Sequence, residues 1–164
     1  MSLSILQISL KVSPFVQIVV FAYVVGQSKA IMRVLHAYHK VKVTLASTTV
    51  MTTEVKRSKF ITYLVPTVEF EGLQSKLKQE HPKANHVVYA LRTLNEFEQI
   101  VENSSDDGEP KGCAGIPALN VLRGEGLINC AVLIVRYFGG IKLGTGGMAR
   151  AYALAVKNVL GEAE

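Results

Sequence analysis

The chain has 164 residues, of which 49% are hydrophobic, and its mean hydropathy is positive. This composition supports a packed core and excludes an intrinsically disordered chain. The formal net charge of +5 is uneven, because residues 1–44 contain five Lys and Arg and no acid, whereas residues 45–164 contain 13 of each sign. A domain that is neutral overall does not present a general basic face to nucleic acid, although a local basic patch is compatible with this count.

Residues 1–44 are predicted to be a hydrophobic, basic extension of the domain at 45–164. Its apolar run, Phe15–Val25, has 11 residues, short of the roughly 20 that span a membrane, so no membrane span is expected. Three interpretations of the extension stay open. It can be a secretory signal cleaved after Ser28-Lys29-Ala30, a segment translated upstream of a true start at Met51, or an additional strand.

The first half of the domain alternates strand and helix patterns. Strands are predicted over Val41–Val50, Ser58–Val65 and His86–Arg92 from their β-branched and aromatic residues. Val68–Glu80 has apolar residues spaced among charged ones, which predicts an amphipathic helix. Asn95–Asn103 fits either a strand or a short helix.

The second half continues the same alternation after a polar loop over Asn103–Gly115. Pro117 suits the first turn of a helix, whose body is Ala118–Leu122. Cys130–Phe138 is almost continuously apolar, which is typical of a central strand buried on both faces. Met148–Leu160 predicts a final helix. Helices covering a mixed β-sheet, in an α+β or α/β fold, follow from this order.

A joint rich in glycine separates the apolar strand from the final helix. Such density implies backbone that is left-handed or that approaches something closely. Amides at a helix N-terminus hold phosphates and carboxylates, and flanking cations add charged donors. The glycines of the joint are Gly139, Gly140, Gly144, Gly146 and Gly147, and the flanking cations are Arg136, Lys142 and Arg150.

The known nucleotide-binding motifs do not fit this joint. Thr145 stands where a Walker A motif needs lysine. Gly144, Gly146 and Ala149 match the spacing of a dinucleotide fingerprint, but they do not follow the strand closely, and no later strand supplies the ribose-binding acid. The alternative is that the glycines make a tight turn and let the helix pack on the sheet.

An acidic loop is the second candidate site. Asp106, Asp107 and Glu109 are carboxylates within four positions, the ligand type that divalent cations prefer, but their spacing is not that of an EF-hand. A solvated Asp-Gly turn is the simpler interpretation. Cys113 and Cys130 lack the spacing of a zinc site or a disulfide framework, so neither is expected.

Three long strings closely resemble the IMPACT/YigZ family over about Thr48 to Leu160. They are HPKANHVVYALR, SDDGEPKGCAGIPALNVL and RYFGGIKLGTGGMARAY. The resemblance implies an α+β fold similar to the second domain of a small-subunit ribosomal protein and to a domain of elongation factor G. Bacterial relatives usually carry a second, ferredoxin-like domain and have no settled activity. The eukaryotic relative regulates translation by interfering with activation of the kinase that responds to amino-acid starvation.

Two positions depart from the family pattern. Cys113 replaces the usual threonine, and Ile116 replaces a common lysine. The missing lysine removes an anion contact and weakens a phosphate-binding interpretation.

We therefore expect a soluble, cytoplasmic binding or regulatory domain linked to translation, with no cofactor. Its partner would be RNA, the ribosome or a regulatory protein, held in a groove between the acidic loop and the joint. The predicted binding residues are His86, Asp106, Asp107, Glu109, Arg136, Gly139, Gly140, Lys142, Gly144, Gly146, Gly147 and Arg150. The alternative is a Mg²⁺-dependent hydrolase or phosphotransfer-type enzyme that uses the Asp106–Glu109 loop.

Overall fold

The structure is a computed structural model that describes residues 43–45 and 47–163. These residues belong to one compact unit that begins at Val41. The interpretations of the N-terminal extension concern residues outside the described part. The elements, in chain order, are β1 (Val43–Thr44), β2 (Thr49–Val55), β3 (Ser58–Pro66), the 3₁₀ helix η1 (Thr67–Glu69), α3 (Phe70–Glu80), β4 (His86–Leu94), β5 (Ile100–Ser105), α4 (Gly115–Gly124), β6 (Leu127–Ile128), β7 (Cys130–Tyr137) and α5 (Gly144–Ala163).

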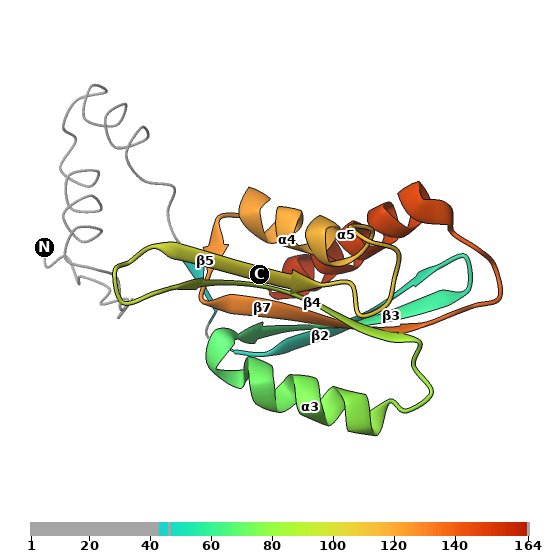
Figure 1. The fold of residues 1–164 in the computed structure, drawn as a ribbon, viewed down its shortest axis with the longest axis horizontal. Coiled ribbons are helices and arrows are strands. Elements are labelled where there is room, and N and C mark those ends of the chain that lie inside the picture. Colours follow the sequence, from blue (N-terminus) through green and yellow to red (C-terminus); the bar gives the residue numbers. More distant parts are fainter. Residues whose placement is uncertain (1–42, 46, 164) are drawn as a thin grey trace, which may run out of the picture. The chain divides into compact units, whose positions relative to one another are not determined.

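The main sheet has five strands in the order β2-β3-β7-β4-β5, and every neighbouring pair is antiparallel (Figure 1). Parallel pairing is confined, among the described residues, to the short strands β1 and β6. The α+β class is thus confirmed, whereas the expected mixed sheet is antiparallel throughout its five strands. The likeness to a ribosomal-protein domain stays a prediction.

The predicted central strand is confirmed in β7, which pairs with β3 on one side and β4 on the other. Its side chains alternate between two cores. Val132 and Ile134 face the core shared with α4 and α5, while Leu133 and Val135 face the core shared with α3. Both faces of this strand are buried, which explains why its sequence is continuously apolar.

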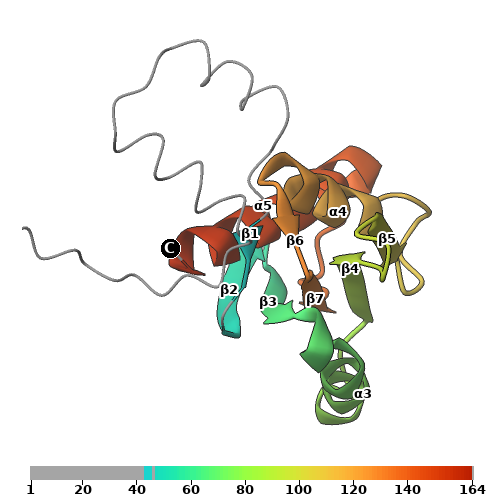
Figure 2. The same ribbon diagram turned by 90° about the vertical axis from the view of Figure 1, so that its left-hand side faces the viewer.

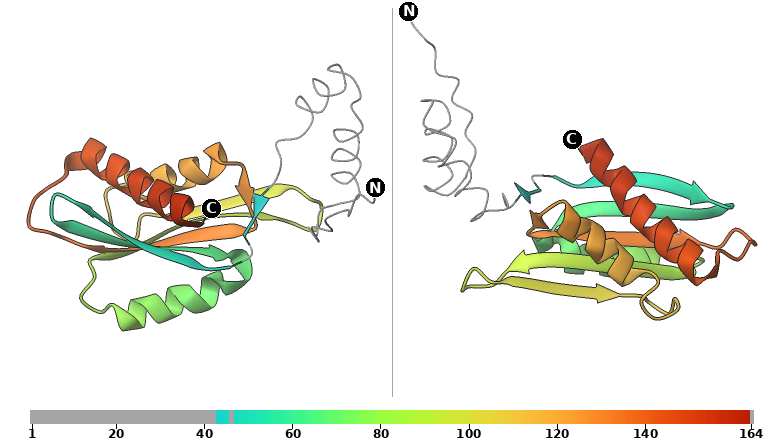
Figure 3. Two further views of the ribbon diagram at one scale, coloured as in Figure 1. Left: turned by 180° about the vertical axis from the view of Figure 1, so that it is seen from behind. Right: turned by 90° about the horizontal axis from the view of Figure 1, so that it is seen from above.

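Helices cover both faces of the sheet. Figures 2 and 3 show α4 and α5 side by side over one face and α3 on the other. Tyr152 of α5 packs edge-on against Phe60 of β3, with ring centroids 5.1 Å apart. On the other face, Leu77 of α3 is buried. Among the described residues, no helix is both long enough and apolar enough to cross a membrane.

Three element boundaries differ from the sequence-based expectations. The strand expected at Val41–Val50 is two strands, because β1 pairs with β6 and β2 starts anew at Thr49. The ambiguous stretch at Asn95–Asn103 is a turn followed by β5. The final helix begins at Gly144 instead of Met148, so its N-terminus and free amides lie within the glycine-rich joint.

Candidate functional site

The glycine-rich joint leaves β7 after Tyr137 and lies against the β2–β3 turn. A Cβ atom at Gly139 would overlap the carbonyl group of Arg57 and the amide nitrogen of Ser58, so only glycine fits this close approach. The Gly139 N–H also donates to Ser58 Oγ at 3.2 Å. The joint is therefore fixed to the hairpin at its first glycine.

The other glycines of the joint have different surroundings. Gly140 and Gly144 have positive φ angles of 83° and 70°, a region that strains other residues. Gly146 and Gly147 lie in the first turn of α5, where an added Cβ would meet its nearest neighbour at 3.5 Å, an ordinary contact distance. Glycine is thus favoured by backbone conformation at Gly140 and at Gly144, where α5 begins, but not at Gly146 and Gly147.

Arg136, near the end of β7, is buried, with 6% of its side chain exposed. Its Nη1 donates to Glu109 Oε1 and lies 3.9 Å from Met148 Sδ. The guanidinium carbon lies 5.7 Å from the ring centroid of Phe60 and 5.9 Å from that of Phe138. Arg136 Nε has no hydrogen-bond partner among the described residues, and the guanidinium group lies beside the rings of Phe60 and Phe138. The Arg136 side chain, which was predicted to contact a ligand, is buried in this conformation and supports the site from the core.

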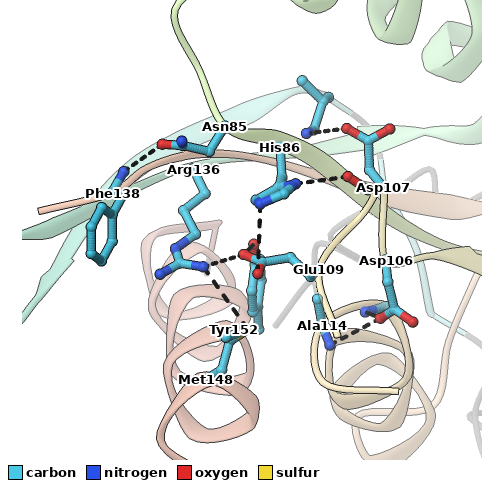
Figure 4. A network of polar contacts seen from close by, with 12 residues as sticks. Asn85, His86, Asp106, Asp107, Glu109, Ala114, Arg136, Phe138, Met148 and Tyr152 are labelled. Carbon is cyan, nitrogen blue, oxygen red and sulfur yellow. Dashed lines mark hydrogen bonds and ion pairs between the residues drawn. The ribbon is translucent and has the colours of Figure 1, made fainter. Parts of the chain in front are cut away.

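Glu109 joins the acidic loop to the core (Figure 4). Its side chain is 3% exposed, and Oε1 accepts from both Arg136 Nη1 and Tyr152 Oη, the latter at 2.8 Å. Burial, followed by the charge of Glu109, raises the pKa of Tyr152, so this phenol stays protonated and donates. The carboxylate therefore lies between the acidic loop and α5 and joins them to β7. The recognition groove expected between the acidic loop and the joint stays a prediction.

His86 begins β4 and closes the other side of this network. Its Nδ1 lies 2.7 Å from the carbonyl oxygen of Asp107, and because a carbonyl can only accept, Nδ1 carries the proton. Its Nε2 lies 3.7 Å from Glu109 Oε2. The Asp107 carboxylate accepts from the Val87 N–H at 2.7 Å and from Lys78 Nζ at 3.1 Å. Asp107 and His86 thus fasten the acidic loop to the start of β4.

Asp106 organises the start of α4. Its Oδ1 accepts from the N–H groups of Ala114 and Gly115 at 3.0 and 2.8 Å, and its Oδ2 accepts from the Gly112 N–H at 2.7 Å. Burial alone would raise the pKa of Asp106, but the three amide hydrogen bonds outweigh burial and hold it below the ordinary value. The carboxylate supplies the capping that the first turn of α4 needs.

The carboxylates of the acidic loop, on which the enzyme hypothesis depends, are each engaged with a different set of donors. Asp106 accepts from backbone amides, Asp107 from Val87 and Lys78, and Glu109 from Arg136 and Tyr152. The described part of the chain has no group of three or more His, Cys, Asp or Glu side chains arranged to hold a metal ion. The adjacent carboxylates point to different donors, so closeness in sequence did not produce a shared site.

The β2–β3 hairpin, the joint and the start of α5 carry exposed cations, and the joint meets the hairpin at Gly139. Arg57 contacts Gly139 through its backbone, and Lys59 pairs with Tyr137 across β3 and β7. We call the five exposed side chains at this place, in the β2–β3 hairpin and the joint with the start of α5, the basic end. They are Lys56, Arg57, Lys59, Lys142 and Arg150.

The sequence predicted Lys142 and Arg150 but missed the three cations of the hairpin. Lys56 and Arg57 occupy the turn with positive φ angles of 45° and 67°. Nothing local indicates that this turn lies against the joint, some 80 residues later in the chain. The sequence between the two predicted strands indicated a turn. Only the pairing of β3 with β7 shows that this turn belongs to the same end of the sheet as the joint.

An antiparallel five-stranded sheet, covered by helices on both faces and braced by a buried ionic network, defines a small α+β domain. The Impact N-terminal domain matches residues 56–160, and the chain belongs to the IMPACT family.

Known relatives agree with this assignment. The chain is 44% identical over 117 residues to an IMPACT family member of Haemophilus influenzae, covering 70% of this chain and 57% of that protein. It is 40% identical over 112 residues to the IMPACT family member YigZ of Escherichia coli, covering 65% and 54%. A crystal structure of a hypothetical protein superposes with a TM-score of 0.63 at 36% identity, covering 71% and 58%. The chain thus spans between half and three-fifths of the length of these proteins.

Proposed function

We propose that the chain is a binding module of the translation apparatus that contacts RNA phosphates through the basic end. The observation that carries the proposal is the close approach of Gly139 to Arg57, which joins two distant segments that both carry exposed cations. Phosphate contacts from Lys and Arg supply much of the affinity of proteins for nucleic acid. The link to translation rests on what the family resemblance implies, and we expect the protein in the cytoplasm, where translation takes place.

The N-terminus of α5 adds directional donors to this surface. The helix has 20 residues and begins at Gly144, so its first amides lie within the joint. Unpaired amides and the helix dipole favour phosphate at this position. Lys142 and Arg150 are exposed on either side of Gly144 and supply mobile charges beside the fixed amides.

The remaining predicted residues have a supporting role in this proposal. His86, Asp107, Glu109 and Arg136 hold the acidic loop and the end of β7 in place through the buried network. Asp106 fixes the start of α4. The recognition surface is therefore the outer side of the joint and the hairpin, and the acidic loop lies behind it.

Binding of the full chain to RNA at graded salt concentrations tests the proposal. We expect affinity for a fluorescently labelled RNA oligomer to fall steeply with salt, because bound phosphates release counterions. In the double variant Lys142→Ala with Arg150→Ala, affinity should fall several-fold at low salt. Its slope of log affinity against log salt should be shallower by about 1.4, the value for two lost contacts on a single strand.

The matched control is Lys76→Ala with Lys157→Ala, which removes two exposed cations elsewhere. Lys157 lies about 20 Å along α5 from Gly144, given the rise of a helix, and Lys76 lies on α3. This control should bind as the unmodified protein does. Equal losses in both double variants, or RNA binding that is insensitive to salt, would reject the basic end as the RNA site. If the protein binds no RNA but still retains a partner protein after nuclease treatment, recognition of a protein would be favoured instead.

A further inference from the structure

We infer that the RNA is bound as a single strand, with one base stacked on the ring of Phe138. This inference rests on the proposed function and names the form of RNA that the same surface takes. Phe138 follows β7 directly, at the start of the joint, and 47% of the residue is exposed. An aromatic ring among phosphate-binding cations is the arrangement by which proteins hold single strands without reading sequence.

The ring of Phe138 has one supported face. The Arg136 guanidinium carbon lies 5.9 Å from its centroid, and Arg136 is itself held by Glu109. Figure 4 shows Phe138 at the margin of the network, beside the Arg136 side chain. A guanidinium on one face keeps the ring in a fixed orientation. The exposed part of the ring is thus available to a base.

The backbone of Phe138 is fixed on both sides. Its N–H donates to Asn85 Oδ1 at 2.8 Å. The next residue, Gly139, donates to Ser58 Oγ and lies too close to Arg57 for a side chain. A platform that is already ordered loses little conformational entropy when a ligand stacks on it.

Base stacking requires bases that are not already stacked in a helix. A duplex presents its phosphates to Lys142 and Arg150 but keeps its base faces covered, so it gains nothing from Phe138. A flexible single strand satisfies both the cations and the ring. Preference for single strands over duplex is therefore the signature that distinguishes this surface from a simple cationic patch.

Phe97 provides a natural comparison within the same domain. It is more exposed than Phe138, at 72%, and lies in the β4–β5 turn beside Glu96 and Glu98. This turn is at the opposite end of the sheet, because β4 begins opposite Arg136 and ends at Leu94. The acidic neighbours repel phosphate, so exposure of an aromatic ring alone does not predict stacking there.

The test compares three probes with the full chain: a 12-nucleotide uridine RNA, a duplex RNA of equal length, and heparin, a polyanion without bases. Phe138→Leu keeps an apolar side chain over Arg136 but removes the aromatic face. We expect Phe138→Leu to bind the single strand about tenfold more weakly and to bind duplex and heparin as before. Phe138→Tyr, which keeps the ring, should retain single-strand affinity, as should Phe97→Leu.

Loss of the phosphate site and loss of base stacking give different experimental results. If the unmodified protein shows no salt-sensitive RNA binding, the proposed function and the stacking inference both fall. If it binds RNA but Phe138→Leu binds the single strand equally well, stacking on Phe138 is overturned while the phosphate site stands. An equal loss for single strand, duplex and heparin would also overturn stacking, because it would reflect a distorted surface. Thermal unfolding midpoints of the variants check that each is folded.

Discussion

At the scale of single residues, the network around Glu109 stabilises the site only while the charges of both Glu109 and Arg136 are present. Arg136 and Glu109 are each at least nine-tenths buried, and they neutralise each other next to Tyr152. Removing two charges from water is costly, and the pair offsets that cost through its direct hydrogen bond and the added phenol hydrogen bond. Loss of one partner leaves the other as an unpaired buried charge.

Glu109→Ala should lower the free energy of unfolding by about 3–5 kcal/mol, the usual effect of breaking a buried ion pair from one side. Urea unfolding at neutral pH measures this loss. The double variant Glu109→Leu with Arg136→Leu should be more stable than Glu109→Ala, because it leaves no unpaired charge. A loss below about 1 kcal/mol in Glu109→Ala would mean that the network does not brace the loop.

Substitution by alanine should change the stability of the domain in opposite directions at two glycines of the joint. Gly139→Ala forces a Cβ into the Arg57 carbonyl and must displace either the joint or the hairpin. We expect loss of at least about 1–3 kcal/mol together with weakened RNA binding. Gly146→Ala meets no close contact in the first turn of α5 and should stabilise by up to about 1 kcal/mol. Thermal unfolding of both variants tests the pair, and similar effects at the two positions would contradict the close approach at Gly139.

At the scale of elements, the start of α4 depends on a carboxylate from the acidic loop. The Asp106 carboxylate accepts from three backbone N–H groups where the loop leads into the helix, those of Gly112, Ala114 and Gly115. Gly115 itself packs against the backbone of Ser105, at 3.0 Å from the position of an added Cβ. The loop and the helix are therefore one unit, held by Asp106 from the end of β5.

The stability of this unit should depend on pH in the acid range. The pKa of folded Asp106 lies below its ordinary value of 3.8, so the unfolded chain takes up the proton more readily. The stability that ionised Asp106 supplies is fully present above about pH 5 and is lost as the pH falls through the folded-state pKa. Asp106→Ala should be less stable by about 1–3 kcal/mol at pH 7. The gap between it and the unmodified protein should narrow towards pH 2.5 in thermal unfolding; a constant gap would show that the charge of Asp106 is not the cause.

Local patterns predicted elements well where one environment acts along the whole segment. β7 is buried on both faces, and α4 begins two residues before Pro117, as a helix with proline in its first turn should. One failure lies where a distant partner decides, because β1 is a separate strand that pairs with β6. The other is local, because α5 begins early where the positive φ of Gly144 turns the chain into the helix.

At the scale of the whole molecule, the charge count concealed how the charges are arranged. The domain is neutral by composition, yet five of its exposed cations belong to the basic end, while Glu96 and Glu98 lie at the other end of the sheet. The sequence predicted Lys142 and Arg150 as binding residues, and that role stays a prediction. The predicted burial of Cys130–Phe138 on both faces includes Arg136, but no sequence pattern indicated that Arg136 pairs with Glu109 or that Arg57 adjoins Gly139, because both depend on how distant segments meet in the fold.

The position of a charge, and not the net charge, should therefore control RNA affinity. Glu54→Lys and Glu96→Lys each raise the net charge by two, but Glu54 lies opposite Lys59 at the basic end, whereas Glu96 lies in the far turn. A strand of nine residues such as β4 separates the two ends by about 30 Å, well beyond the Debye length of about 8 Å at physiological salt. Glu54→Lys should bind RNA several-fold more tightly with a steeper salt dependence, and Glu96→Lys should stay within about twofold of the unmodified protein. Equal gains in fluorescence titrations at 150 mM salt would show that the molecule attracts RNA by its total charge and would remove the reason for assigning the contact to the basic end.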